Sequence, residues 1–231
     1  MADSSGTSAC KDIRQRICVI FDFDGTLADT MDSIVAVARQ VLVDFGFSED
    51  ELGDLRRLVG PPFPQAFSEV YGLSVSDAAE VTRRYRAIYE TLGPIAWPAF
   101  TGIPVLLEDL KSSGRILAVA SSKRDVLLKR CVREAKLAEY FKLIKGKQDD
   151  QASSKAITIS SILDELGLQA DQAVMVGDRR NDVCAAREAG LPCVGVYYGN
   201  TAPDGELEQA SALAIAHSVF ELHEILLAKD A

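Results

Sequence analysis

The stretch Ile17-Cys-Val-Ile-Phe-Asp-Phe-Asp-Gly-Thr-Leu-Ala-Asp-Thr30 decides the predicted fold of this chain. Its first five residues are apolar and mostly β-branched or aromatic, which is typical of a strand buried on both faces. Asp22 and Asp24 follow, and buried carboxylates need a metal ion or a tight hydrogen-bond network to offset their desolvation. Two positions apart on a strand, they would share one face, and Gly25 permits a sharp turn. The stretch therefore predicts either an anionic site at a strand end or an ordinary solvated turn.

The composition indicates a globular protein with a sizeable core and excludes several classes of partner. The 231 residues are 48% hydrophobic, and the formal net charge is −9. This acidic balance argues against nonspecific binding to nucleic acid or to an anionic membrane, so we expect neither partner. No apolar run approaches the ~20 residues that span a bilayer. The cysteines are scattered without a C-x-x-C pair: Cys10, Cys18, Cys131, Cys184 and Cys193. Such cysteines predict buried reduced thiols in a cytoplasmic protein, which we expect to be a monomer or a weak dimer.

Residues 30–96 have the pattern of an inserted helical domain. Apolar residues recur at helical spacing over 29–45, 65–71 and 76–92, and Ser48 with Glu51 resembles a capping box for a short helix. Val59-Gly-Pro-Pro-Phe-Pro64 is a break between these helices, because prolines interrupt regular helix. Before this domain, residues 1–15 are rich in serine, alanine and charge and predict a disordered tail.

Residues 97–231 alternate between strand and helix patterns, and with residues 16–29 they predict one core domain. Strands are expected over 115–120, 141–145, 172–176, 192–197 and 212–216. Helices are expected over 103–112, 125–136, 153–166, 182–189 and 219–227. This alternation predicts an α/β fold, a Rossmann-like parallel sheet covered by helices on both faces, with the helical domain inserted after the first strand.

Polar residues at the ends of these strands predict a phosphoryl-transfer site. Ligands of open parallel sheets bind beyond the carboxyl ends of the strands, where we expect six groups to converge: Asp22, Asp24, Ser121, Lys155, Asp178 and Asp182. Carboxylate oxygens suit Mg²⁺, whereas a serine hydroxyl and a lysine ammonium suit phosphate oxygens. These are the parts needed for in-line transfer to an aspartate nucleophile. Acyl transfer is not indicated, because the chain has no Ser–His pair and its histidines, His217 and His223, lie near the C-terminus.

These motifs resemble those of the haloacid dehalogenase-like superfamily. The resemblance rests on Asp22-Phe-Asp-Gly-Thr-Leu27, Ser121 after a buried strand, Lys155 and Gly177-Asp-Arg-Arg-Asn-Asp182, in this order, with a helical insert after the first. Further segments resemble its phosphoglycolate phosphatase-like or 5′-nucleotidase-like branch: Gly60-Pro-Pro-Phe63, Ser153-Ser-Lys-Ala156, Met175-Val-Gly-Asp-Arg179 and Val194-Gly-Val-Tyr-Tyr-Gly199. That branch often has Lys-Pro where this chain has Lys155-Ala156.

The resemblance implies a Mg²⁺-dependent hydrolysis of a small phosphate ester through an aspartyl-phosphate. Asp22 would be the nucleophile, and Asp24 would be the general acid and then the base for water. The implied Mg²⁺ ligands are Asp22, the main-chain carbonyl of Asp24, Asp178 and Asp182. The implied phosphate-binding residues are Thr26, which also shapes the loop, Ser121 or its neighbour Ser122, and Lys155. The helical insert would be a cap that selects the substrate, with Arg57, Gly60 and Phe63 as candidate specificity residues.

Each candidate also has a purely structural interpretation. Asp178 could cap a helix, Asp182 suits the first turn of one, and Lys155 could lie on the surface. Lys123 and Arg124 read as a solvated helix start, and Arg57 reads as part of an exposed helix face.

Rival functions share the fold. A phosphosugar mutase of the β-phosphoglucomutase type tends to carry Glu-Asp where this chain has Gly177-Asp178. Dehalogenases usually lack the second aspartate, which is Asp24 here. A noncatalytic module of the same fold would not need Asp22 and Asp24. Phosphoglycolate, a nucleoside monophosphate, a sugar phosphate and pyridoxal phosphate all stay open as substrates.

Overall fold

The computed structural model describes residues 13–148 and 154–228, which contain one parallel sheet. Its strands are β1 (Cys18–Phe21), β2 (Ile116–Arg124), β3 (Leu143–Lys147), β4 (Ala173–Gly177), β5 (Cys193–Val196) and β6 (Ala214–Ala216). They lie in the order β3-β2-β1-β4-β5-β6, and every pair is parallel. The expected Rossmann-like α/β sheet is therefore confirmed. Ligand sites form where the strand order reverses, which here is beside the carboxyl end of β1.

Helices cover both faces of the sheet, because successive strand residues point to opposite faces. Val19 and Phe21 of β1 belong to one buried cluster, and Cys18 and Ile20 belong to the other. The first face packs against α6 (Ile103–Ser112), α7 (Asp125–Glu134) and α11 (Val219–Leu227). The second packs against α8 (Lys155–Leu166) and α9 (Arg180–Glu188), with α10 (Glu206–Gln209) beside α9. Short 3₁₀ turns η3 (Ala138–Tyr140) and η4 (Ala170–Gln172) precede β3 and β4.

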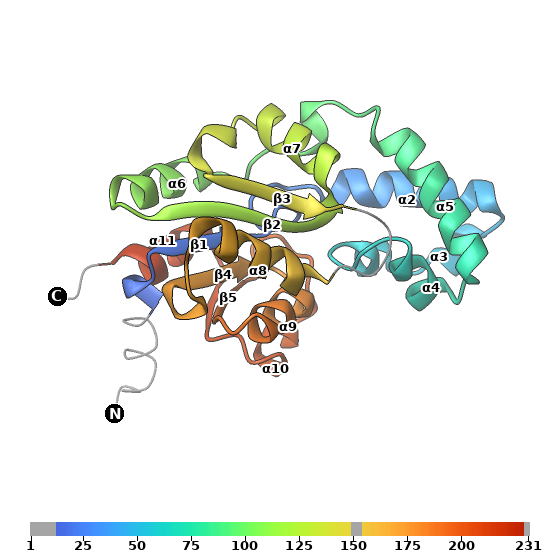
Figure 1. The fold of residues 1–231 in the computed structure, drawn as a ribbon. Coiled ribbons are helices and arrows are strands. Elements are labelled where there is room, and N and C mark those ends of the chain that lie inside the picture. Colours follow the sequence, from blue (N-terminus) through green and yellow to red (C-terminus); the bar gives the residue numbers. More distant parts are fainter. Residues whose placement is uncertain (1–12, 149–153, 229–231) are drawn as a thin grey trace.

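The segment between β1 and α6 is helical. It contains α2 (Met31–Phe45), α3 (Glu49–Leu52), η1 (Leu55–Leu58), α4 (Gln65–Tyr71), α5 (Val75–Tyr89) and η2 (Pro94–Ala96). Helices α2 and α5 pack against each other, and their buried residues join the core of the first sheet face. Figure 1 shows these helices beyond the arrowhead of β3, so they lie over the carboxyl end of the sheet.

The structure differs from the sequence expectations at several boundaries. Strand β2 continues to Arg124 instead of ending at Ala120, because after a register irregularity Arg124 pairs with Lys147 of β3. The expected tail was 1–15, but residues 13–15 form a helical turn and Ile13 is fully buried in the core; residues 1–12 lie outside the described part. Helix α9 begins two residues earlier than expected, at Arg180. Within the described residues, none of the helices has both the length and the apolar character needed to cross a membrane.

Candidate active site

The loop after β1 holds Asp22 in a fixed position. Its backbone N–H donates to the carbonyl of Val176 at 2.9 Å, and its Oδ1 accepts from the N–H of Phe23 at 2.7 Å. Gly25 then turns the chain with φ +72°, and a Cβ there would lie 2.3 Å from Oδ2 of Asp178. Only glycine fits this close approach, so the loop brings the first motif directly against the fourth.

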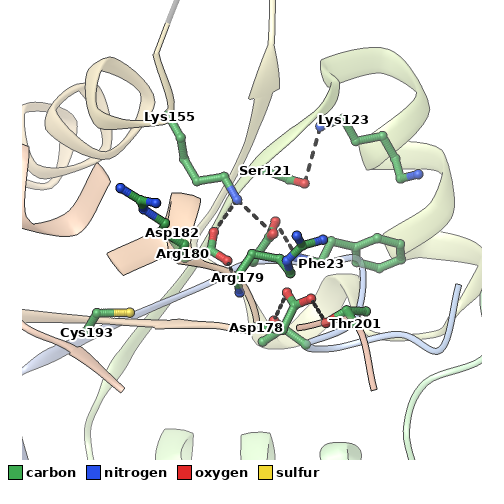
Figure 2. A network of polar contacts seen from close by, with 12 residues as sticks. Phe23, Ser121, Lys123, Lys155, Asp178, Arg179, Arg180, Asp182, Cys193 and Thr201 are labelled. Carbon is green, nitrogen blue, oxygen red and sulfur yellow. Dashed lines mark hydrogen bonds and ion pairs between the residues drawn. The ribbon is translucent and has the colours of Figure 1, made fainter. Parts of the chain in front are cut away.

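Three buried carboxylates gather at this point. Asp22, Asp178 and Asp182 each offer an oxygen, and these oxygens lie within 4.8 Å of one another. Nζ of Lys155 donates to Oδ2 of Asp22 at 2.7 Å. It also donates to Asp182, as Figure 2 shows. The convergence predicted for these four residues is thus present in the structure.

The hydroxyls of two threonines hold Asp178. Thr26 donates to its Oδ1 at 2.9 Å, and Thr201 donates to its Oδ2. Thr26 was predicted to bind phosphate, but its hydroxyl is directed at this carboxylate. Its carbonyl accepts from the hydroxyl of Tyr198 at 2.7 Å, so Thr26 orients the cluster from behind.

The electrostatics of the cluster favour a bound cation. Burial raises the pKa of Asp178 well above its usual value, and the charges of Asp182 and Asp22 raise it further. Burial also raises the pKa of Asp182, although Lys155 opposes that shift. Burial alone would lower the pKa of Lys155, but Asp182 and Asp22 raise it above its usual value. Three carboxylates facing one ammonium leave uncompensated negative charge, and a compact set of hard oxygen donors fits Mg²⁺.

A cavity lies between the sheet edge and the helical segment. Its core side includes Asp22, Asp24, Ser121 and Ser122. Ser121 is buried and its Oγ accepts from the N–H of Lys123 at 3.4 Å, which leaves the hydroxyl hydrogen available for a ligand. The structure therefore brings both aspartates of the first motif and both candidate serines to one cavity.

The opposite wall of the cavity comes from the helical segment. It is formed by residues of α2, η1, α5 and the proline-rich break: Ile34, Leu58, Gly60, Pro61, Pro62, Phe63, Tyr85, Arg86, Tyr89 and Glu90. Gly60 and Phe63 thus lie where substrate selection was predicted. Arg57 does not line this cavity; it lies in a separate surface hollow with Arg56, Arg179 and Asn200.

The sequence interpretation assigned Lys123 to a solvated helix start and so missed its place in the site. Its side chain is only 8% exposed, because β2 continues past Ser121 and carries it inward. Its Nζ lies 3.1 Å from Oδ1 of Asp24, as an ion pair without hydrogen-bond geometry, and 4.7 Å from the ring centroid of Tyr89. Burial would lower the pKa of Lys123, but Asp24 and Tyr89 raise it. A lysine directly after the Ser-Ser pair was the signal that the sequence offered.

Thr201 and Arg179 were also missed. Thr201 follows β5, whose carboxyl end meets the same sheet edge, so the rule used for the other strand ends applies here too. Arg179 lies between two candidate metal ligands, and its backbone N–H donates to Oδ2 of Asp182 at 3.0 Å. The sequence contained both positions but no signal of their contacts.

Residues 19–196 match the family of haloacid dehalogenase-like hydrolases. The chain belongs to this family. The predicted superfamily and the predicted class of enzyme, a hydrolase, are therefore confirmed. The four motifs that carried the prediction correspond to the residues that the structure brings together at the carboxyl end of the sheet.

Similar proteins include enzymes that act on phosphate groups. A 5′-nucleotidase of Pseudomonas aeruginosa is 36% identical over 78% of this chain and 82% of that protein. The tyrosine-protein kinase PtkA of Mycobacterium tuberculosis is 36% identical over 90% of this chain and 72% of that protein. The crystal structure of a predicted phosphatase from Clostridium acetobutylicum is 36% identical, with a TM-score of 0.85, over 90% of this chain and 97% of that one.

Proposed function

We propose that this hydrolase is a Mg²⁺-dependent phosphatase that cleaves a small phosphomonoester through an aspartyl-phosphate on Asp22. One observation carries the proposal: Asp22 belongs both to the buried carboxylate cluster and to the floor of the cavity. A nucleophile in that position reaches a ligand in the cavity from one side and a cation from the other. The similarity to named phosphatases supports the same reaction.

The charges of the site suit an anionic substrate only when a cation is present. Asp22, Asp178 and Asp182, together with the main-chain carbonyl of Asp24, would hold Mg²⁺. The bound ion would neutralise the phosphate so that an anionic carboxylate can approach it. Lys155 supplies a further positive charge at the same place, and Ser121 offers its hydroxyl to a phosphate oxygen.

The two aspartates of the first motif divide the chemistry between them. An oxygen of Asp22 bonds to phosphorus while the bond from phosphorus to the leaving oxygen breaks, and Asp24, which must enter this step in its protonated form, gives its proton to that oxygen. Water then attacks phosphorus and gives a proton to Asp24 while the bond between Asp22 and phosphorus breaks, so inorganic phosphate leaves and both side chains return to their starting states. Residues 30–96 act as a cap that covers the cavity and excludes bulk water during the first step.

The geometry around Gly177 disfavours the mutase alternative. A Cβ at this position would lie 2.3 Å from Cβ of Asp182, so there is no room for the glutamate that such mutases carry before Asp178. The presence of Asp24 in the cavity also disfavours dehalogenation, because a halide leaving group needs no proton.

The cavity wall favours a leaving group with apolar faces. Phe63, Tyr85 and Tyr89 line this wall and contact one another in series, with ring centroids 4.9 Å and 5.1 Å apart. Such a wall packs against a planar or apolar group better than against a short carboxylate. We therefore propose a nucleoside monophosphate or a similar ester as the preferred substrate, ahead of phosphoglycolate.

A screen for phosphate release tests these proposals. Purified protein is supplied with nucleoside monophosphates, phosphoglycolate, hexose phosphates and pyridoxal phosphate, with Mg²⁺ or with EDTA. We expect release only with Mg²⁺, and loss of release in Asp22→Asn with an unchanged melting temperature. Asp29→Asn, an exposed aspartate of the same stretch, is the matched control and should retain activity. Full turnover by Asp22→Asn would refute the mechanism.

The similarity to a tyrosine-protein kinase calls for a second assay beside the phosphate-release screen. Labelled ATP with a tyrosine peptide distinguishes transfer to protein from transfer to water. Label on the peptide without release of free phosphate would replace the phosphatase proposal by phosphoryl transfer to protein.

The setting of the enzyme is part of the proposal. We propose that it acts in the cytoplasm as a monomer or weak dimer, without nucleic-acid or membrane partners. The buried free thiols of Cys18, Cys131 and Cys193 support a reducing compartment, and the net charge of −9 supports the absence of nucleic-acid and anionic-membrane partners. Cell fractionation and light scattering of the purified protein measure these properties.

A further inference from the structure

The side chain of Arg179 connects the turn between β4 and α9, next to Asp178, to the helical segment. Its Nη1 donates to the carbonyl of Val59, and its Nε donates to Oε1 of Glu206 at 3.0 Å. Both charged side chains are largely buried, with 12% and 18% of their surfaces exposed. This pair therefore differs from the solvated surface ion pairs that contribute little to structure.

The core side of this connection is well anchored. Oε1 of Glu206, at the start of α10, also accepts from the N–H of Arg180 at 2.8 Å. The backbone N–H of Arg179 is directed at Asp182. The guanidinium is thus held on one side by groups of the core and donates its remaining contact to Val59, which belongs to the inserted segment.

The segment Val59–Phe63, here called the cap loop, packs directly on this side chain. Gly60 has φ +100°, and a Cβ there would lie 2.5 Å from Cγ of Arg179. Gly60 and Phe63 both line the catalytic cavity. The position of Arg179 therefore determines where the wall of the cavity stands relative to the carboxylates on its floor.

We propose that Arg179 is a positioning residue that sets the affinity for the leaving group of the substrate by holding the cap loop against the core. The proposal rests on the phosphatase function proposed above. The side chain acts through Val59 and Gly60, whereas its backbone serves Asp182 independently. Removal of the side chain should consequently disturb recognition of the leaving group and leave the metal and phosphate contacts in place.

Steady-state kinetics of Arg179→Ala separate these effects. For the best substrate of the screen, we expect the KM to rise about tenfold, the change expected from losing about 1.4 kcal/mol of binding, while kcat stays within about twofold. The inhibition constant of inorganic phosphate and the Mg²⁺ concentration for half-maximal activity should stay unchanged, because phosphate and Mg²⁺ would bind to residues of the sheet edge and not to the cap loop. Arg179→Lys should show an intermediate KM, since one ammonium lacks the fork that reaches both acceptors.

Arg180→Ala is the matched control. This substitution removes the same charge from the neighbouring residue. The side chain of Arg180 is exposed, and only its backbone N–H donates to Glu206, a contact that alanine keeps. We expect wild-type constants for this variant. Gly60→Ala disturbs the same contact from the side of the cap loop, because its Cβ would clash with Arg179. This variant should raise the KM without changing the phosphate inhibition constant.

Amide hydrogen exchange provides a readout that does not depend on activity. Peptides covering residues 55–63 should exchange faster in Arg179→Ala than in the wild type or in Arg180→Ala. An unchanged KM together with unchanged exchange overturns the proposal, and so does a joint shift of KM, phosphate inhibition and Mg²⁺ requirement, which would assign the effect to Asp182. A wild type that releases no phosphate refutes the proposed function instead, while the exchange experiment still decides whether Arg179 holds the cap loop.

Discussion

Replacing Lys155 by methionine removes the ammonium that faces Asp22 and Asp182. The lysine side chain is only 5% exposed, and methionine has a similar length without the charge. Removing one partner of a buried ion pair costs about 3–5 kcal/mol, because the remaining charge stays buried and uncompensated. For a chain of this size, each kcal/mol shifts the melting temperature by about 2–4 °C, so we expect a decrease of about 6–20 °C without Mg²⁺.

Thermal unfolding followed by circular dichroism measures this decrease in EDTA and in Mg²⁺. Mg²⁺ should recover part of it, because the cation binds the same carboxylates and stabilises the folded state. Lys129→Met is the control: Lys129 is 50% exposed and pairs with Asp125 at 2.8 Å, an ion pair that contributes about 0–1 kcal/mol. A Lys155→Met protein that melts within about 2 °C of the wild type in EDTA would refute the reasoning that this cluster depends on its ammonium.

Two further predictions concern the same cluster. In EDTA, the free energy of unfolding should fall as the pH rises above about 4, because the pKa values of Asp178 and Asp182 are raised in the folded protein, which therefore retains protons that the unfolded chain releases. Mg²⁺ should abolish this fall by binding the ionised forms, and urea titrations with pH-independent results in EDTA would contradict the prediction. Gly25→Ala should lose at least about a hundredfold in kcat/KM, because its Cβ would displace a carboxylate of the cluster, and Gly46→Ala should keep full activity. Gly46 also has a positive φ, +119° against +72° for Gly25, but no neighbour within 4 Å, so equal losses in the two variants would assign the effect to backbone strain alone.

The first motif was predictable because its geometry is local. An apolar run followed by Asp22, Asp24 and Gly25 predicts a buried strand that ends in carboxylates, and the structure has both aspartates on one cavity. The placement of Ser121 and Asp178 near one edge of the sheet followed from the alternation of strands and helices, since parallel strands place all their carboxyl ends at one edge. Such inferences need only the order of the elements.

The basic residues could not be sorted in the same way. Arg57, Lys123 and Arg179 are all cationic and all lie near a predicted motif, yet their contacts in the structure differ. Lys123 is buried against Asp24, and Arg179 donates to the carbonyl of Val59. Arg57 lies exposed in a surface hollow that Arg179 also lines. Burial depends on which residues pack above a side chain: the groups that cover Lys123 and Arg179 come from distant parts of the chain, whereas Arg57 is exposed.

The class of fold and the candidate residues Asp22, Asp24, Asp178 and Asp182 could be read from the sequence alone, because strand and helix patterns depend on periodicity and parallel strands place their carboxyl ends at one edge. Tertiary structure alone decided which side chains face Asp22 across the cavity and how the cap loop is held. The contact of Arg179 with Val59 joins residues 120 positions apart. A hydrogen bond across that separation forms only after the sheet and the helical segment have packed, so local pattern carries no information about it.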